Sequence, residues 1–269
     1  MNKRVKKPKK YRRVFTHGIG FLWQADLLDF QNIKLQNDNF AYVCCIVDTF
    51  SKMLYTFPLK QKTSLEMVQT LSPLFASKPP KFCQTDPGTE FKNKPMQDMF
   101  KKYNVKWYQS YSQKKCVFVE RVQRTIRSRL GKVWSMNENK RWIDVLADLT
   151  NGYNNSLHSS IKMKPIDVTS EHTRLISQRL FGNRKKHSRS GPKRSIKIGD
   201  LVRASALHRT FKKESDNQWT DEIFVVKTVK RTNPPTYILQ DFNGEEIMGG
   251  FYYEEIQKIS HDKLKPSSA

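Results

Sequence analysis

Three strand-like segments lie within the first sixty residues of this 269-residue chain. The segment FLWQADLLDF at 21–30 has apolar side chains on both faces, as expected of a central strand covered on each side. FAYVCCIV at 40–47 is apolar throughout, and KMLYTFPL at 52–59 follows it after the short turn DTFS, so these two strands should be antiparallel neighbours. The chain must therefore build a sheet whose interior strands are buried on both faces.

Helical and strand-like patterns alternate after this first part of the sheet. Thr63 is a candidate N-cap with Glu66 at the capping-box spacing, ahead of apolar residues at helical intervals. The remaining patterns predict a strand near 81–85, a helix near 94–103, a strand near 105–109, and helices near 119–133 and 138–154. This order of elements predicts a layered α/β domain.

Short strand-like runs return in the last third of the chain, as IGDLVRAS, EIFVVKTV, PTYILQD and GGFYYEEI. Their length and the turn signals between them predict a small β-barrel or sandwich. Its aromatic residues could form an exposed surface, although packing in a small core is the more common role for most of them; they are Trp219, Phe224, Tyr237, Phe251 and Tyr252. We expect a basic N-terminal arm at 1–20, a core at 21–175, a basic linker at 176–195, the barrel at 196–260 and a tail at 261–269.

Positive charge is concentrated in two segments. The chain has 49 Lys and Arg against 25 Asp and Glu, a net charge of +24. Residues 1–13 hold eight basic and no acidic side chains, and residues 182–197 hold seven and none. Such runs are solvated tails in many proteins, but as blocks they suit phosphate contacts or nuclear import. We expect a nuclear protein that binds nucleic acid, and no membrane span, because no apolar stretch of about 18 residues is present.

The four cysteines are not spaced as a zinc site or as a disulfide framework. Cys44 and Cys45 lie within an apolar run, which favours buried thiols. We therefore expect the cysteines to pack rather than to bind metal.

Three acidic residues occupy predicted core elements. Asp26 lies inside an apolar strand, where a carboxylate is costly to bury. An arginine partner or a hydrogen-bonded turn explains such a residue more often than a metal ion. Asp86 follows a predicted strand and begins a Pro-Gly turn, which presents side chains at the rim of a sheet but is ordinary by itself. Glu120 begins a helix with otherwise cationic exposed faces, where it could complement the helix dipole or pair with Arg124. Together, the three acids suggest convergence on one site.

The segments WQADLLDF, IVDTFSK, QTDPGTEF and SYSQKKCVFVERVQRT resemble the integrase catalytic core of retroviruses, retrotransposons and the Polinton or Maverick DNA transposons. The likeness runs from about Trp23 to Asp167. It implies a ribonuclease H-like mixed sheet with flanking helices, followed by a small SH3-like or chromodomain-like barrel. It assigns Asp26, Asp86 and Glu120 as the catalytic and metal-binding acids. Thirty-three residues separate the last two, close to the family's spacer of about thirty-five.

The resemblance implies DNA integration by metal-dependent DNA strand transfer, with two Mg²⁺ or Mn²⁺ ions held by these acids. It also implies DNA as the partner, a homo-oligomer on DNA, and an association with chromatin as a further option. Candidate phosphate contacts are Lys114, Lys115, Arg121, Arg124 and Arg127.

Two features of the sequence depart from the family pattern. A basic arm stands in place of the zinc domain that precedes many such cores, and Pro87 and Gln123 differ from the common motif forms. The alternative function is a catalytically silent, domesticated DNA- or chromatin-binding protein. A ribonuclease H-like nuclease acting on hybrids is a weaker option.

Overall fold

The computed structural model describes residues 14–86, 88–109, 116–182, 196–205, 219–220, 222–230, 232, 234–247 and 250–259. They form two compact units, one within 15–182 and one within 196–259. Several sequence predictions concern residues outside this described part: most of the basic arm, the linker from 183 to 195, the tail, Pro87, Lys114 and Lys115.

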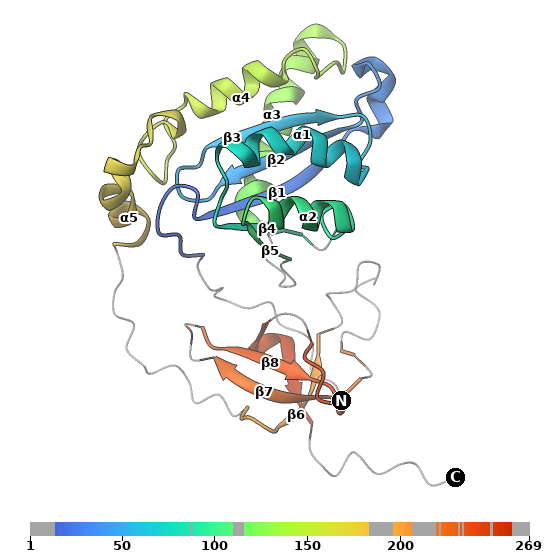
Figure 1. Ribbon diagram of the computed structural model, residues 1–269, viewed down its shortest axis with the longest axis vertical. Coiled ribbons are helices and arrows are strands. Elements are labelled where there is room, and N and C mark those ends of the chain that lie inside the picture. The colour runs from blue at the N-terminus through green and yellow to red at the C-terminus, as the bar shows by residue number, and fades with distance from the viewer. Residues whose placement is uncertain are drawn as a thin grey trace. The chain divides into compact units, whose positions relative to one another are not determined.

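The first unit is a five-stranded mixed sheet with helices on both faces (Figure 1). The strands lie in the order β3-β2-β1-β4-β5; β1–β2 and β2–β3 pair antiparallel, whereas β1–β4 and β4–β5 pair parallel. This confirms the predicted α/β class and the central place of the first strand. The elements, in chain order, are β1 (Leu22–Asp29), η1 (Gln31–Asn37), β2 (Tyr42–Asp48), β3 (Leu54–Leu59), α1 (Ser64–Ser77), β4 (Phe82–Thr85), α2 (Lys94–Lys102), β5 (Lys106–Gln109), α3 (Val117–Asn137), α4 (Leu146–Asn154), η2 (Pro165–Asp167), η3 (Ser170–His172) and α5 (Thr173–Phe181).

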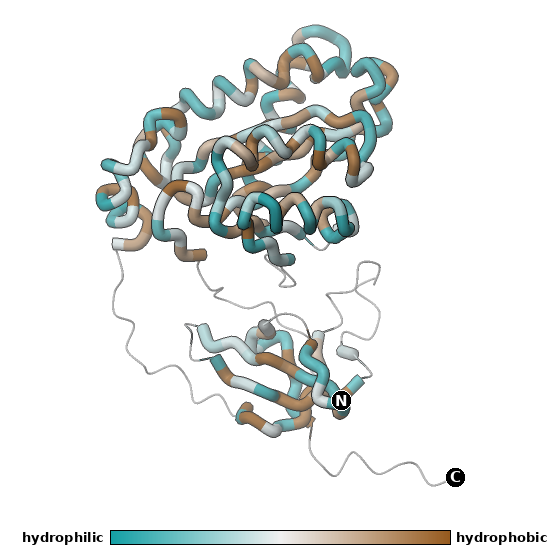
Figure 2. The backbone as a smooth tube through the Cα atoms, viewed as in Figure 1, coloured by the Kyte–Doolittle hydropathy of each residue, from teal (hydrophilic) through white to brown (hydrophobic). Residues whose placement is uncertain are grey.

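Alternation along β1 divides its side chains between two cores. Trp23 and Ala25 pack in the cluster that α1 and α2 supply, whereas Leu28 packs in the cluster that α3 and α4 supply. In Figure 2 hydrophobic residues follow the strands, while the helices alternate between hydrophobic and hydrophilic residues. The side chain of Asp26, which has the parity of Leu28, therefore belongs to the α3 face of the sheet.

The predicted N-cap of α1 is present. Thr63 Oγ1 accepts a hydrogen bond from the Glu66 backbone N–H at 3.4 Å. The Glu66 carboxylate does not complete the capping box, because it accepts from the backbone N–H groups of Lys60 and Gln61, each at 2.7 Å. Glu66 thus holds the residues just before α1 in place.

The helix predicted at 138–154 begins later, as α4, at Leu146. Glu138 ends α3 in the left-handed conformation, with φ of 52°. Asn37 Oδ1 then accepts hydrogen bonds from the backbone N–H groups of Trp142 and Ile143, at 2.6 and 3.1 Å. These contacts hold the segment before α4 in a turn, which helical periodicity could not reveal.

The folded chain continues past residue 175, the predicted end of the core. Helix α5 extends to Phe181, and Ile176 is buried against Phe50 and Ile161. The expected linker at 176–195 therefore starts inside a helix.

The second unit is a five-stranded antiparallel sheet in the order β10-β6-β7-β8-β9, as the all-β prediction required. Trp219, Phe224, Tyr237 and Tyr252 are buried and Phe251 packs against the core, so these aromatic residues serve mainly as packing. The elements are β6 (Leu201–Ala204), β7 (Phe224–Lys230), β8 (Thr236–Gln240), β9 (Phe251–Tyr252), η5 (Tyr253–Glu255) and β10 (Ile256–Lys258).

The cysteines are buried free thiols, as predicted for Cys44 and Cys45. Of the helices that the structure describes, none combines the length and the apolar character needed to cross a membrane.

Candidate active site

The pairing of β1 with β4 places two of the predicted acids side by side. These strands are parallel and in register, with Ala25 opposite Thr85. The next positions along the same register are Asp26 and Asp86. Equivalent residues of parallel neighbours point to the same face, and neighbouring strands lie about 4.8 Å apart. The sheet itself therefore brings the two carboxylates together.

Gln24 connects this face of the sheet to the start of α3. Its Nε2 donates to Gln84 Oε1 at 2.9 Å. The side-chain amides two residues before Asp26 and Asp86 are therefore also paired. Gln24 Oε1 accepts from the backbone N–H groups of Phe118 and Val119, at 2.9 and 3.4 Å. The Gln24 side chain is buried, and it fixes the first turn of α3 over the strands that carry the aspartates.

The surroundings of Asp26 disfavour its ionised form. Burial raises the pKa of Asp26 to about 6. The negative charges of Asp86 and Glu90 act in the same direction, whereas the Leu27 backbone N–H and the Gln123 side chain lower the pKa. Two adjacent carboxylates raise each other's pKa until a cation neutralises them. The pair therefore has the electrostatics of a cation-binding site.

Glu120 lies in the first turn of α3, where its backbone N–H donates to the Cys116 carbonyl at 3.0 Å. Residues three apart on a helix share a side, so Glu120 lies one turn before Gln123, whose side chain lowers the pKa of Asp26. Within the described part of the chain, however, no three or more His, Cys, Asp or Glu side chains are grouped closely enough to hold a metal ion. The structure brings Asp26 and Asp86 together and does not assemble Glu120 with them.

The donor types fit the ions that the sequence predicts. Carboxylate oxygens are hard ligands of the kind that Mg²⁺ and Mn²⁺ prefer. Asp26 and Asp86 supply two such carboxylates. No basic side chain is among the groups that shift the pKa of Asp26. The two aspartates would hold the ion, with Glu120 as the third candidate.

Two neighbours of this pair were not singled out from the sequence. The Glu90 carboxylate turns back over Gly88, where an added Cβ would come within 2.2 Å of Glu90 Oε1. Cys116, which precedes α3, interacts with Asp86 and donates to the Gln84 carbonyl at 3.7 Å; burial and the Asp86 charge raise its thiol pKa far above the usual range. The position of Glu90 within QTDPGTEF was a signal for its proximity, whereas nothing local marked Cys116.

The predicted phosphate contacts on α3 have different surroundings. Arg127 donates to the Asp29 carbonyl at 3.5 Å, and its guanidinium lies 5.1 Å from the Phe30 ring centre. Arg124 is exposed one turn after Glu120, and Arg121 lines a cavity on another side of the helix. Only Arg124 and Arg127 flank the side of α3 that carries Glu120.

Residues 19–115 match the family model described as the integrase core domain. A transposon-derived protein of Caenorhabditis elegans is 31% identical to this chain over 209 residues, which cover 76% of this chain and 67% of that protein. The chain belongs to the integrase catalytic core family. This chain is also 25% identical over 162 residues to the transposon Tf2-3 polyprotein of Schizosaccharomyces pombe, covering 58% of the chain but 12% of the polyprotein.

The fold is similar to that of a chain in the cryo-EM structure of the simian T-cell lymphotropic virus intasome in complex with PP2A regulatory subunit B56 gamma. The TM-score is 0.62 at 15% identity, over 96% of this chain and 85% of that chain. At this identity the likeness concerns the fold, which is the ribonuclease H-like core that the sequence predicted.

Proposed function

We propose that this integrase is a polynucleotidyl transferase that cuts and joins DNA with Mg²⁺ or Mn²⁺ held by Asp26, Asp86 and Glu120. The observation that carries the proposal is the in-register pairing of β1 and β4, which sets Asp26 beside Asp86 on the face that α3 covers. Family membership supports the same reaction class.

Each residue of the site has its own role in the proposed reaction. Asp26 and Asp86 would bind the cation, and the Gln123 side chain, which lowers the pKa of Asp26, would favour its ionised carboxylate. When bound, two divalent ions would activate an attacking oxygen and stabilise the leaving oxygen of an in-line displacement at phosphorus. Arg124, exposed on the Glu120 side of α3, would position a DNA phosphate without reading the base sequence.

DNA as substrate is supported by the net charge of +24, which attracts polyanions and makes their binding salt-dependent. The proposal includes a homo-oligomer on DNA and action in the nucleus, where the substrate is found. Association with chromatin belongs to the second candidate function below.

The test is nicking of supercoiled plasmid by the full chain in Mg²⁺, Mn²⁺ or EDTA, followed by transfer of an oligonucleotide 3′-hydroxyl into plasmid. The wild type should act only with metal. Glu120→Gln keeps the size of the side chain but removes its charge, and should lower the rate by about 10³-fold or more.

Asp29→Asn is the matched control, because Asp29 is exposed at the end of the same strand that carries Asp26. It should cut like the wild type. Nicking that survives both EDTA and Glu120→Gln would contradict the proposed site.

A second candidate is a DNA- or chromatin-binding protein without catalysis. It is favoured by the two basic segments at 1–13 and 182–197, which can contact phosphate groups without a bound metal ion. It predicts tight DNA binding without metal-dependent nicking by the wild type, and binding that Asp26→Asn leaves unchanged.

A further inference from the structure

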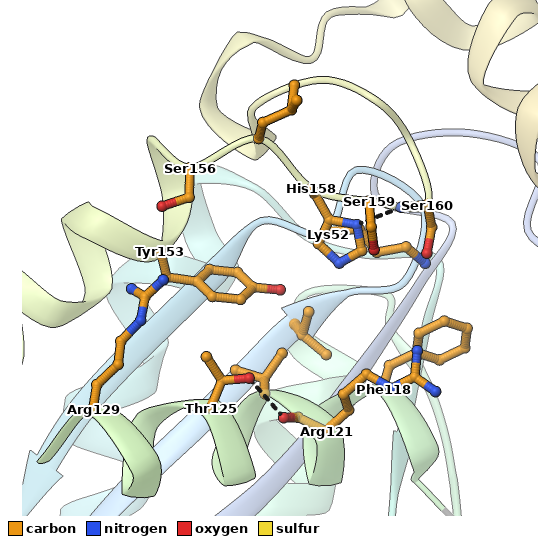
Figure 3. Close-up of a pocket in the computed structure, with 13 residues that line it drawn as sticks. Lys52, Phe118, Arg121, Thr125, Arg129, Tyr153, Ser156, His158, Ser159 and Ser160 are labelled. Atoms are coloured by element: carbon orange, nitrogen blue, oxygen red, sulfur yellow. Dashed lines mark hydrogen bonds between the residues drawn. The ribbon is translucent and has the colours of Figure 1, made fainter. Parts of the chain in front are cut away.

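A cavity of about 290 Å³ lies on the side of α3 away from Glu120. Its walls are α3, the turn between β2 and β3, the end of α4 and the segment 156–160 that follows α4 (Figure 3). A volume near the lower end for ligand pockets suits a small group rather than a large organic molecule.

The positions of its α3 residues show that the cavity is separate from the candidate active site. An α-helix turns about 100° per residue, so Phe118, Thr125 and Arg129 share one side of α3. Glu120 and Gln123 project from the opposite flank, with the buried stripe of the helix between the two sides. A ligand in this cavity would not touch Asp26 or Asp86.

The charged residues of the cavity are all cations. Among its described lining residues, Lys52, Arg121 and Arg129 are basic and none is Asp or Glu. None of the three forms a salt bridge within the part of the chain that the structure describes. Three basic groups around one small cavity favour an anion.

Lys52 is the most buried of these cations, with 4% of its surface exposed. Its ammonium donates to the Thr49 carbonyl and lies 4.0 Å from the centre of the Phe118 ring. Asp48, whose charge acts on Lys52, uses its carboxylate to accept from the backbone N–H groups of Gly20, Phe50 and Ser51. A buried ammonium with this environment would gain from an anion in the cavity.

Neutral hydrogen-bond donors complete the lining. His158 Nδ1 accepts from the Ser160 backbone N–H at 3.2 Å, which leaves the proton of the neutral ring on Nε2. Burial, together with the charges of Lys52 and Arg121, lowers the pKa of His158 to about 4, so the ring is neutral at pH 7. In Figure 3 the Tyr153 hydroxyl points into the same space.

We propose that this cavity binds a phosphate group. Guanidinium groups match phosphate oxygens in paired hydrogen bonds, and an ammonium adds a compact positive charge. The phosphate is either a phosphodiester of a DNA strand or the phosphate of a small solute, since both present the same oxygens to the cavity. This site does not depend on the proposed strand transfer, because it is formed without Asp26, Asp86 or Glu120.

The test uses the metal-free full chain in EDTA at low ionic strength, titrated with inorganic phosphate and followed by calorimetry. Arg121→Gln, at the exposed rim of the cavity, should weaken phosphate binding by about tenfold or more, since it removes charged hydrogen bonds. Arg129→Gln should do the same. Lys101→Gln is the control, because Lys101 is exposed on α2, which packs on the other face of the sheet from α3.

A single-stranded oligonucleotide separates the two phosphate sources. Competition between oligonucleotide and inorganic phosphate, lost in Arg121→Gln, assigns the cavity to DNA; phosphate binding without competition assigns it to a small solute. The proposal is overturned if the wild type does not bind phosphate, or if Lys101→Gln weakens binding as much as Arg121→Gln. Arg121→Gln keeps the test decisive if Arg129→Gln, which loses the bond to the Leu149 carbonyl, fails to fold.

Discussion

Asp26→Asn should raise the stability of the metal-free protein at pH 7.5 while removing its response to Mg²⁺. Burial raises the folded-state pKa of Asp26 to about 6 from an ordinary value of 3.8. The ionised carboxylate therefore destabilises the fold above pH 6, and this penalty disappears as the pH falls below about 4. A shift of this size corresponds to at most about 3 kcal/mol at neutral pH.

The measurement is urea unfolding of the wild type and the variant at pH 7.5 and pH 5. The gain from Asp26→Asn should shrink by about half at pH 5, because the wild-type carboxyl is then mostly protonated in the fold. Mg²⁺ should stabilise the wild type and not the variant, since only the former binds the ion. Asp29→Asn, at the exposed end of β1, should show none of these effects. A variant less stable than the wild type at pH 7.5 would show that the Asp26 charge is not a cost.

Asn37→Ala should destabilise the first unit by roughly 3 kcal/mol or more. The Asn37 side chain is fully buried and accepts from the Trp142 and Ile143 backbone N–H groups. Its Nδ2 donates to the carbonyls of Ile33 and Lys140, at 2.9 and 3.1 Å. Alanine would remove these bonds at once and leave buried backbone groups unpaired.

Urea unfolding at pH 7 measures this effect. Gln36→Ala is the control, because Gln36 lies in the same 3-10 helix, is exposed, and accepts a hydrogen bond from the Lys140 backbone N–H at 3.2 Å. It should cost less than about 1 kcal/mol. Equal losses from the two substitutions would mean that the Asn37 contacts do not hold the segment before α4.

The sequence alone points to Asp26 as an unusual residue, but it gives no sign of the role of Asn37. Asp26 is visible in the sequence as a carboxylate within an apolar strand, and the strand parity that places it on the α3 face follows from alternation. Asn37 carries no such signal. Three of its four partners lie more than a hundred positions away, and an asparagine between two predicted strands reads as an ordinary loop residue.

The sequence by itself determined the order of strands and helices, the all-β second unit and the buried thiols, because periodicity and turn residues act over a few neighbouring positions. Its motifs also identified the integrase family. Only the tertiary structure decided that Asp26 adjoins Asp86 and that Arg121 lines a cavity. Only it showed that α4 begins at Leu146. These features depend on strand register, on the packing of α3 against its neighbours and on hydrogen bonds between distant segments. The packing of the folded chain sets all of them, and no local sequence pattern does.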